Sequence, residues 1–200
     1  MLRHPRFPRI GMNIEELRDD AAPNLRLIEV IFKLSDMEEE ILKCEPRICT
    51  GLPLKCPKTK GGKWLTRTLK ATNNQLEDMT EIPEVVAELF GCYDWITWLD
   101  LSCNKIASVA PTIKRLSSLK LLYLHGNQIR SLQDVQKLSS LPKLSKLTLH
   151  GNPVEREKNY FHLVLTMLPN LVSLDFTGIS RADHETGKAL KRAGTRHKKQ

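Results

Sequence analysis

One eleven-residue pattern, L-x-x-L-x-L-x-x-N-x-L, recurs along this 200-residue chain. Its four copies begin at Thr66, Ile96, Leu119 and Leu144, the first being slightly degraded. The asparagines at the ninth position lie 30, 23 and 25 residues apart, so the copies keep a nearly constant spacing after an insertion in the first interval. Four matches in register predict a solenoid in which each copy adds one coil to a stack.

Each residue type in the pattern has a physical task. Leucines at the fourth and sixth positions place apolar side chains on the inner face of a short parallel strand. The asparagine turns the chain inside the coil, and its side-chain amide can satisfy backbone groups that the bend leaves unpaired. We therefore expect a structural ladder of stacked asparagines: Asn74, Asn104, Asn127 and Asn152.

A fifth, partial copy at Leu171–Phe176 lacks the asparagine. The segment before it repeats an apolar or aromatic residue every four positions, which is one face of a helix. A helix followed by a last strand is expected of a terminal cap, which closes the core of a repeat protein. The predicted cap residues, with Tyr160 interpreted as a core residue and not a catalytic one, are Tyr160, Val164, Leu168, Leu171, Leu174 and Phe176.

The stretch from Asn152 to Tyr160, followed by Leu168–Asp175, resembles the C-terminal cap of the SDS22-like leucine-rich-repeat class. The blocks that resemble the leucine-rich repeat-containing protein 51 family span about residues 46 to 192, where the repeat register holds. They are Thr50–Lys55, Lys63–Thr66, Asn73–Asn74, Leu122–Asn127, Leu147–Pro153 and Asp175–Gly178.

This resemblance implies an α/β leucine-rich-repeat solenoid, with short parallel β-strands on the concave face, helical or irregular segments on the convex side, and a C-terminal cap. It also implies a cytoplasmic protein with an interaction role, a leaning toward the cilium or axoneme, and no defined reaction.

Breaking residues and charge divide the chain into four parts. Residues 1–50 are a divergent N-terminal segment, with a helix expected over Asn24–Lys43; its apolar residues either cap the first repeat or bind a partner. Residues 51–64 form a basic linker, residues 65–180 the leucine-rich-repeat domain with its cap, and residues 181–200 a basic tail that is partly helical as far as Arg192.

The sequence contains no nucleophile elbow, no phosphate-binding G-x-x-x-x-G-K-[ST] and no HExxH. We expect no enzymatic activity, no small-molecule substrate and no cofactor. The N-terminus lacks the apolar run of a secretory signal, and no stretch reaches the roughly 20 apolar residues that cross a bilayer, so neither export nor a membrane segment is expected.

Neither of two possible metal sites has a complete set of ligands. Cys44, Cys49 and Cys56 lack a CxxC spacing and a clear fourth ligand. The chain has five cysteines in all, and this odd number favours reduced thiols in the cytosol. His125 and His150 occupy the same repeat position and should stack, but no third ligand accompanies them. No metal is expected.

The net charge of +8 is concentrated in residues 51–70 and in the last twenty residues. Such basic segments can contact nucleic acid, although a solvated surface is the simpler interpretation. An alternative function is therefore an adaptor of a ribonucleoprotein whose basic ends touch phosphate. The segment 51–70 contains Trp64 as its single aromatic residue, which disfavours binding of single-stranded nucleic acid.

Residues at the third and fifth pattern positions should point out of the strands onto the concave face. There, Trp98, Leu121 and Tyr123 come from adjacent copies and should form one apolar patch. The flanking charges Lys70, Asp100 and Lys146 would set the orientation of a bound protein. The main hypothesis is a non-catalytic protein–protein interaction scaffold with an unidentified protein partner; the alternative is that the chain's own terminal segment covers the patch.

Overall fold

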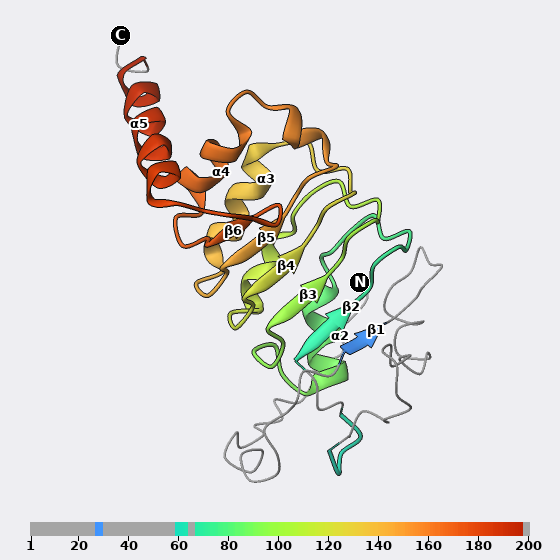
Figure 1. Cartoon of the computed structure of the whole chain (residues 1–200). Helices are drawn as coiled ribbons and strands as arrows, with labels where there is room; N and C mark the ends of the chain where they lie inside the picture. Colours follow the sequence, from blue (N-terminus) through green and yellow to red (C-terminus); the bar gives the residue numbers. More distant parts are fainter. Residues whose placement is uncertain (1–26, 30–58, 64–66, 198–200) are drawn as a thin grey trace, which may run out of the picture.

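The computed structural model describes residues 27–29, 59–63 and 67–197. Its seven-stranded sheet follows chain order from β1 to β7, and every neighbouring pair is parallel except the antiparallel pair β6–β7. Figure 1 shows the strands side by side along one face, with α2, α3 and α4 behind them. The strands are β1 (Leu27–Glu29), β2 (Thr68–Lys70), β3 (Trp98–Asp100), β4 (Leu121–Tyr123), β5 (Lys146–Thr148), β6 (Ser173–Leu174) and β7 (Thr177–Gly178).

Short helices run along the side of the coils opposite the sheet. Proline occupies the first or second position of three of them, where a missing backbone N–H is tolerated. This architecture confirms the predicted leucine-rich-repeat solenoid. The short helices are α2 (Ile82–Phe90), η2 (Pro111–Arg115), α3 (Leu132–Lys137), η3 (Leu138–Ser140), η4 (Pro153–Arg156) and α4 (Tyr160–Met167), and the longer α5 (Arg181–His197) follows the last strand. Among the described residues, no helix combines the length and the apolar composition needed to cross a membrane.

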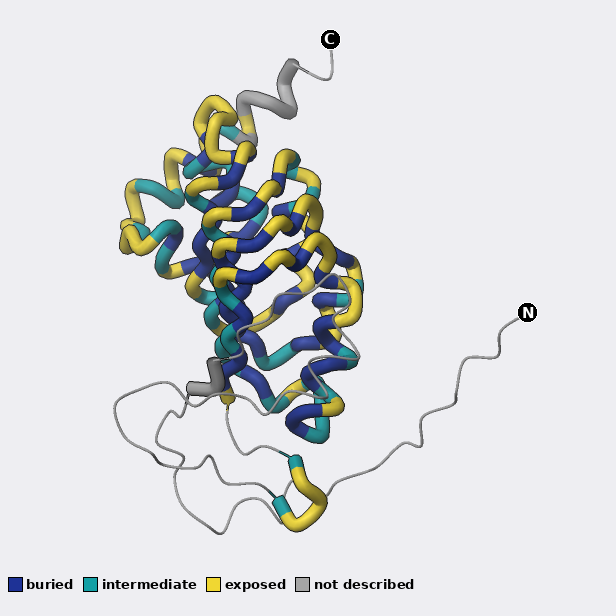
Figure 2. The backbone as a smooth tube through the Cα atoms, turned by 90° about the vertical axis from the view of Figure 1, so that its right-hand side faces the viewer, coloured by how far each residue is buried: buried dark blue, intermediate teal, exposed yellow. Residues whose placement is uncertain are grey.

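A column of leucines forms the centre of the core. The strand register aligns Leu69 with Leu99, Leu99 with Leu122, Leu122 with Leu147 and Leu147 with Leu174, and all five are buried. Figure 2 shows the resulting alternation of buried and exposed residues along the coils. Burial of each leucine contributes about 1.5–3 kcal/mol, and most of it depends on the neighbouring coil being in place.

The asparagines form hydrogen bonds both within their own coil and to the preceding one. Asn127 Oδ1 accepts from the backbone N–H of Ile106 at 3.0 Å, and Asn127 Nδ2 donates to the carbonyls of Leu101 and Leu124, each at 2.9 Å. The side chain therefore satisfies buried backbone groups of two coils at once. The same arrangement recurs one coil earlier and one coil later, at Asn104 and Asn152. In the first copy, Asn74 Nδ2 donates to the Thr72 carbonyl.

The residue before each ladder asparagine lies in the left-handed region of backbone conformation. The φ angles are 59° at Asn73, 55° at Cys103, 68° at Gly126 and 71° at Gly151. Glycine suits this position because it adopts positive φ without a steric cost. It also suits the stacking, since a Cβ on Gly151 would lie 3.2 Å from the Gly126 nitrogen.

The N-terminal segment differs from the predicted helix where the structure describes it. Leu27–Glu29 is a strand, β1, and Ile28 aligns with Leu69 of β2. Strand pairing satisfies the open edge of a parallel sheet, which a helix over these residues would leave unpaired. The remaining predicted features of residues 1–58, including the three cysteines, lie outside the described residues. Within the predicted linker, Lys63 Nζ bonds the Glu88 carboxylate of α2 at 2.8 Å.

The end of the chain forms a longer helix than the sequence predicts. Helix α5 continues to His197 and packs against α4. Ser180 and Asp183 cap its start reciprocally: Asp183 Oδ2 accepts from the Ser180 N–H at 2.8 Å, and Ser180 Oγ accepts from the Asp183 N–H at 3.2 Å. Gly187 permits the close approach, because a Cβ there would lie 3.2 Å from the His162 carbonyl oxygen.

The ladder makes a first prediction. Asn127→Ala should lower the free energy of unfolding by about 1–3 kcal/mol, because the buried Ile106 N–H loses its partner and the carbonyls of Leu101 and Leu124 each lose one of two amide donors. Urea denaturation measures the loss. The matched control is the neighbouring exposed Gln128→Ala, which should change stability by less than about 0.5 kcal/mol. Equal stability of the two variants would contradict the structural role of the ladder.

Candidate functional site

Pairing of β3 with β4 brings the predicted apolar patch together. Trp98 aligns with Leu121, and the Trp98 and Tyr123 rings meet edge to face with centroids 5.6 Å apart. All three side chains are half-buried. Their neighbours Leu99 and Leu122 point inward and are fully buried. Successive residues of each strand therefore alternate between the surface and the core.

Phe176 joins this patch, contrary to its predicted place in the core of the cap. Its side chain is 64% exposed, and its ring centroid lies 5.6 Å from that of Tyr123. The reason is the turn between β6 and β7: Asp175 and Phe176 have φ angles of 51° and 64°. Two consecutive positive φ angles characterise a two-residue hairpin turn, which ends the in-and-out alternation of the strand. The remaining predicted cap residues, Tyr160, Val164, Leu168, Leu171 and Leu174, are buried.

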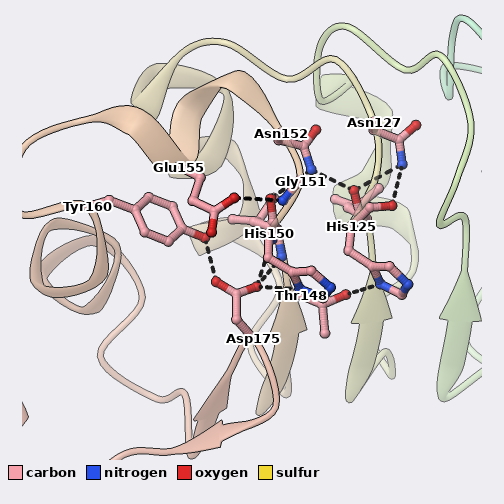
Figure 3. Close-up of polar contacts among 11 residues, drawn as sticks. His125, Asn127, Thr148, His150, Gly151, Asn152, Glu155, Tyr160 and Asp175 are labelled. Atoms are coloured by element: carbon pink, nitrogen blue, oxygen red, sulfur yellow. Dashed lines mark hydrogen bonds and ion pairs between the residues drawn. The ribbon is translucent and has the colours of Figure 1, made fainter.

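His125 and His150 stack beside these aromatic residues. Their ring centroids are 4.6 Å apart with an interplanar angle of 7°, and both rings contact Phe176, at 5.9 and 5.6 Å. His125 Nδ1 bonds Thr148 Oγ1 at 2.8 Å (Figure 3). Burial, with a smaller contribution from His150, lowers the pKa of His125. We call Trp98, Leu121, Tyr123, His125, His150 and Phe176 the concave aromatic surface.

Asp175 fixes the turn that carries Phe176. Its Oδ1 accepts from the backbone N–H groups of Leu149 and His150 at 2.6 and 2.9 Å, and its Oδ2 accepts from the Tyr160 hydroxyl at 2.9 Å (Figure 3). Burial and the Asp175 carboxylate raise the pKa of Tyr160 far above its ordinary value. Tyr160 is therefore a buried, neutral hydrogen-bond donor in the cap.

The three predicted flanking charges occupy different environments. Asp100 does not lie on the rim: it is 7% exposed, and its Oδ1 accepts from the Ser102 N–H and hydroxyl at 3.0 and 2.6 Å. Lys70 is half-buried, with its Nζ 5.3 Å from the centre of the Trp98 ring. Lys146 is exposed in β5. Lys120, which the pattern positions did not select, is exposed immediately before β4.

The described residues contain no group of three or more His, Cys, Asp or Glu side chains arranged to hold a metal ion. The carboxylates of Asp100 and Asp175 are occupied by local hydrogen bonds. What the surface presents to solvent is aromatic and aliphatic area on a rigid sheet, which suits contact with another macromolecule.

Comparison with known proteins places the chain among leucine-rich repeat proteins. The family model described as "Leucine-rich repeat" matches residues 65–199. The mouse protein named Leucine-rich repeat-containing protein 51 is 41% identical over 173 residues, covering 86% of this chain and 88% of that protein. U2 small nuclear ribonucleoprotein A′ of Neurospora crassa is 34% identical over 96 residues, covering 48% of this chain and 38% of that protein.

The fold also matches a solved structure. The crystal structure of the Drosophila melanogaster SNF/U2A′ complex superposes with a TM-score of 0.53 at 23% sequence identity, covering 62% of this chain and 67% of that chain. At this level of identity the likeness concerns the fold.

The half-buried His125 leads to a prediction on pH. Because the pKa of His125 in the folded protein lies below its ordinary value of 6.5, the unfolded chain binds more protons than the folded one just below pH 6.5. The contribution of His125 to stability is therefore fully present above pH 6.5, and it is lost as the pH falls from 6.5 through the lower pKa of the folded state. Urea midpoints at pH 7.5 and 5.5 should differ less for His125→Gln than for the unmodified chain. An identical pH dependence in the two proteins would contradict the burial of this ring.

Proposed function

This chain belongs to the leucine-rich repeat family, alongside relatives named Leucine-rich repeat-containing protein 51, and from that premise we propose that it is a non-catalytic scaffold that binds a protein partner on its concave aromatic surface. The observation that supports this most is Phe176, a large apolar side chain that is 64% exposed beside Tyr123. Exposed aromatic area that contacts further aromatics is typical of interface hot spots.

The geometry of the surface favours tight association. Trp98 and Tyr123 are each in contact with another ring, so they lose little conformational freedom when a partner covers them. The turn carrying Phe176 is fixed by the hydrogen bonds of Asp175. A preorganised surface of this kind converts more of its contact energy into affinity than a mobile one does.

The polar residues near the surface support a non-catalytic role. His150, Asp175 and Tyr160 lie close enough to suggest acid–base chemistry, but the Asp175 carboxylate accepts two backbone N–H groups and the Tyr160 hydroxyl. Tyr160 is buried beneath the turn. These bonds account for the cluster as the closure of the last coil. Leucine-rich repeat proteins are in general non-catalytic interaction modules.

We propose a cytoplasmic location with a role at the ciliary axoneme, on the strength of the resemblance to the leucine-rich repeat-containing protein 51 family. An endogenously tagged chain in multiciliated cells should co-localise with the axoneme. Uniform distribution in the cell body would count against the ciliary role.

A second candidate function is that of a ribonucleoprotein adaptor. The observation that favours it is the 34% identity to U2 small nuclear ribonucleoprotein A′ over 96 residues. If basic segments of the chain contact phosphate, RNA binding should weaken steeply with salt, because counterions are released on binding. A protein-binding scaffold should show a shallow salt dependence instead.

Phe176 provides the test that separates binding from folding. Phe176→Ala should lower partner recovery from ciliated cells at least tenfold, equivalent to about 1.4 kcal/mol. Because the side chain is exposed, stability should change by only about 0.5 kcal/mol. Quantitative mass spectrometry of the captured proteins and a thermal melt measure the two effects.

Two control variants accompany this test. Val172→Ala alters the other large exposed apolar residue in the described part of the chain, which makes none of the ring contacts described, and should retain the partners. Leu101→Ala should lose them through unfolding, at a cost of about 2–5 kcal/mol for a buried leucine. Normal recovery with Phe176→Ala would exclude the concave aromatic surface as the binding site.

A further inference from the structure

Exposed cationic side chains border the concave aromatic surface. Lys146 lies in β5, aligned with Leu121 of the surface, and is exposed. Lys120 is exposed immediately before Leu121. No ion pair between described residues engages either lysine. The backbones of the two lysines are in contact, because the Lys146 N–H donates to the Lys120 carbonyl at 3.0 Å. Two exposed lysines are therefore anchored within one strand spacing of Leu121.

The carboxylates of the same face are already engaged in local hydrogen bonds. Asp100 is buried and bonded to Ser102. Asp175 accepts from two backbone N–H groups and from the Tyr160 hydroxyl. An incoming molecule therefore meets positive charge at the edge of the surface and aromatic area at its centre, while the carboxylates face the protein's own donors.

We propose that the partner segment is an acidic peptide stretch carrying at least one aromatic or aliphatic side chain. The apolar side chain packs against Phe176 and Tyr123, and carboxylates of the segment pair with Lys120 and Lys146. This inference rests on the proposed function, since it assumes that the concave aromatic surface binds a protein. The charges speed association and select the partner, whereas the aromatic contacts supply most of the affinity.

The arrangement of the rings favours a peptide over single-stranded nucleic acid. Bases bind such surfaces by stacking on open aromatic faces. Here Trp98 meets Tyr123 at an interplanar angle of 69°, and Tyr123 meets Phe176 at 72°. The ammonium of Lys70 lies over the Trp98 ring, 5.3 Å from its centroid. Rings that meet edge to face offer no flat platform for successive bases.

The span of the surface sets the length of the probe. From β3, which carries Trp98, to β6, which leads into Phe176, the surface crosses three strand spacings, or about 14 Å at about 4.8 Å each. A twelve-residue peptide reaches about 18 Å even as a helix, so it covers the surface in either helical or extended form.

The experiment is a selection from a random twelve-residue peptide library on the full chain. A parallel selection uses the double variant Lys120→Glu/Lys146→Glu. The matched control is Lys114→Glu/Lys158→Glu, which makes the same change in net charge at exposed sites in η2 and between η4 and α4. Thermal melts of all variants verify folding.

The expected result is enrichment of Asp and Glu beside aromatic or aliphatic residues in peptides selected on the full chain. The affinity of these peptides should fall at least tenfold with Lys120→Glu/Lys146→Glu and with Phe176→Ala, and should be retained by the Lys114→Glu/Lys158→Glu control.

The other outcomes separate the inference from its premise. Peptides that require Phe176 but show no acidic enrichment would overturn the inference and leave the proposed function in place. Peptides indifferent to Phe176→Ala, or no selected peptide, would count against both. Two further measurements test other occupants. If oligouridylate binds more tightly than any selected peptide and depends on the same residues, the occupant is a nucleic acid and the inference is overturned. If the chain self-associates and Lys120→Glu/Lys146→Glu abolishes this, the occupant is a second copy of the chain and the inference is likewise overturned.

Discussion

The hydrogen bonds of the asparagine column are the constraint on which the solenoid depends. Each three-residue strand is too short to be stable alone, and each coil leaves buried N–H and carbonyl groups at its bend. Asn104, Asn127 and Asn152 satisfy these groups in their own coil and in the preceding one. The coils are therefore held at a fixed spacing, and the leucine column stacks in register as a result.

The fixed spacing creates the candidate binding surface. Residues at equivalent positions of adjacent coils, such as His125 and His150, become neighbours although 25 positions separate them in the chain. The same register brings Trp98 beside Tyr123. A flexible chain could not maintain these contacts without a large entropic cost, so the ladder in the bends determines the rigidity of the face that meets a partner.

The C-terminal cap both ends the stack of coils and completes the concave aromatic surface. Asp175 Oδ1 accepts from the Leu149 N–H, whose equivalents in earlier coils donate to the backbone carbonyls of Tyr123 and Thr148, and Asp175 Oδ2 accepts from the Tyr160 hydroxyl. The hairpin turn that follows reverses the chain and leaves Phe176 over the preceding coils. A structural requirement of the last repeat thus produces the most exposed aromatic residue described.

Most of the solenoid could be read from the sequence, because the repeat is a local pattern with one physical solution. The spacing of leucines and asparagines determined the fold class and the buried column, and it placed Trp98, Leu121 and Tyr123 on one face. The stacking of His125 on His150 follows from their equal repeat positions.

The tertiary structure decided those features for which the repeat pattern alone gave the wrong answer or none. Alternation along β6 predicted Phe176 as inward, and two positive φ angles turned it outward. Asp100 was expected at the rim, and its bonds to Ser102 hold it inside. The pairing of Leu27–Glu29 with β2 and the packing of α5 through Gly187 involve partners distant in the chain. A periodic sequence determines the structure of the repeating coils. The two ends of the solenoid depend on contacts that occur only once, so no recurring pattern in the sequence predicts them.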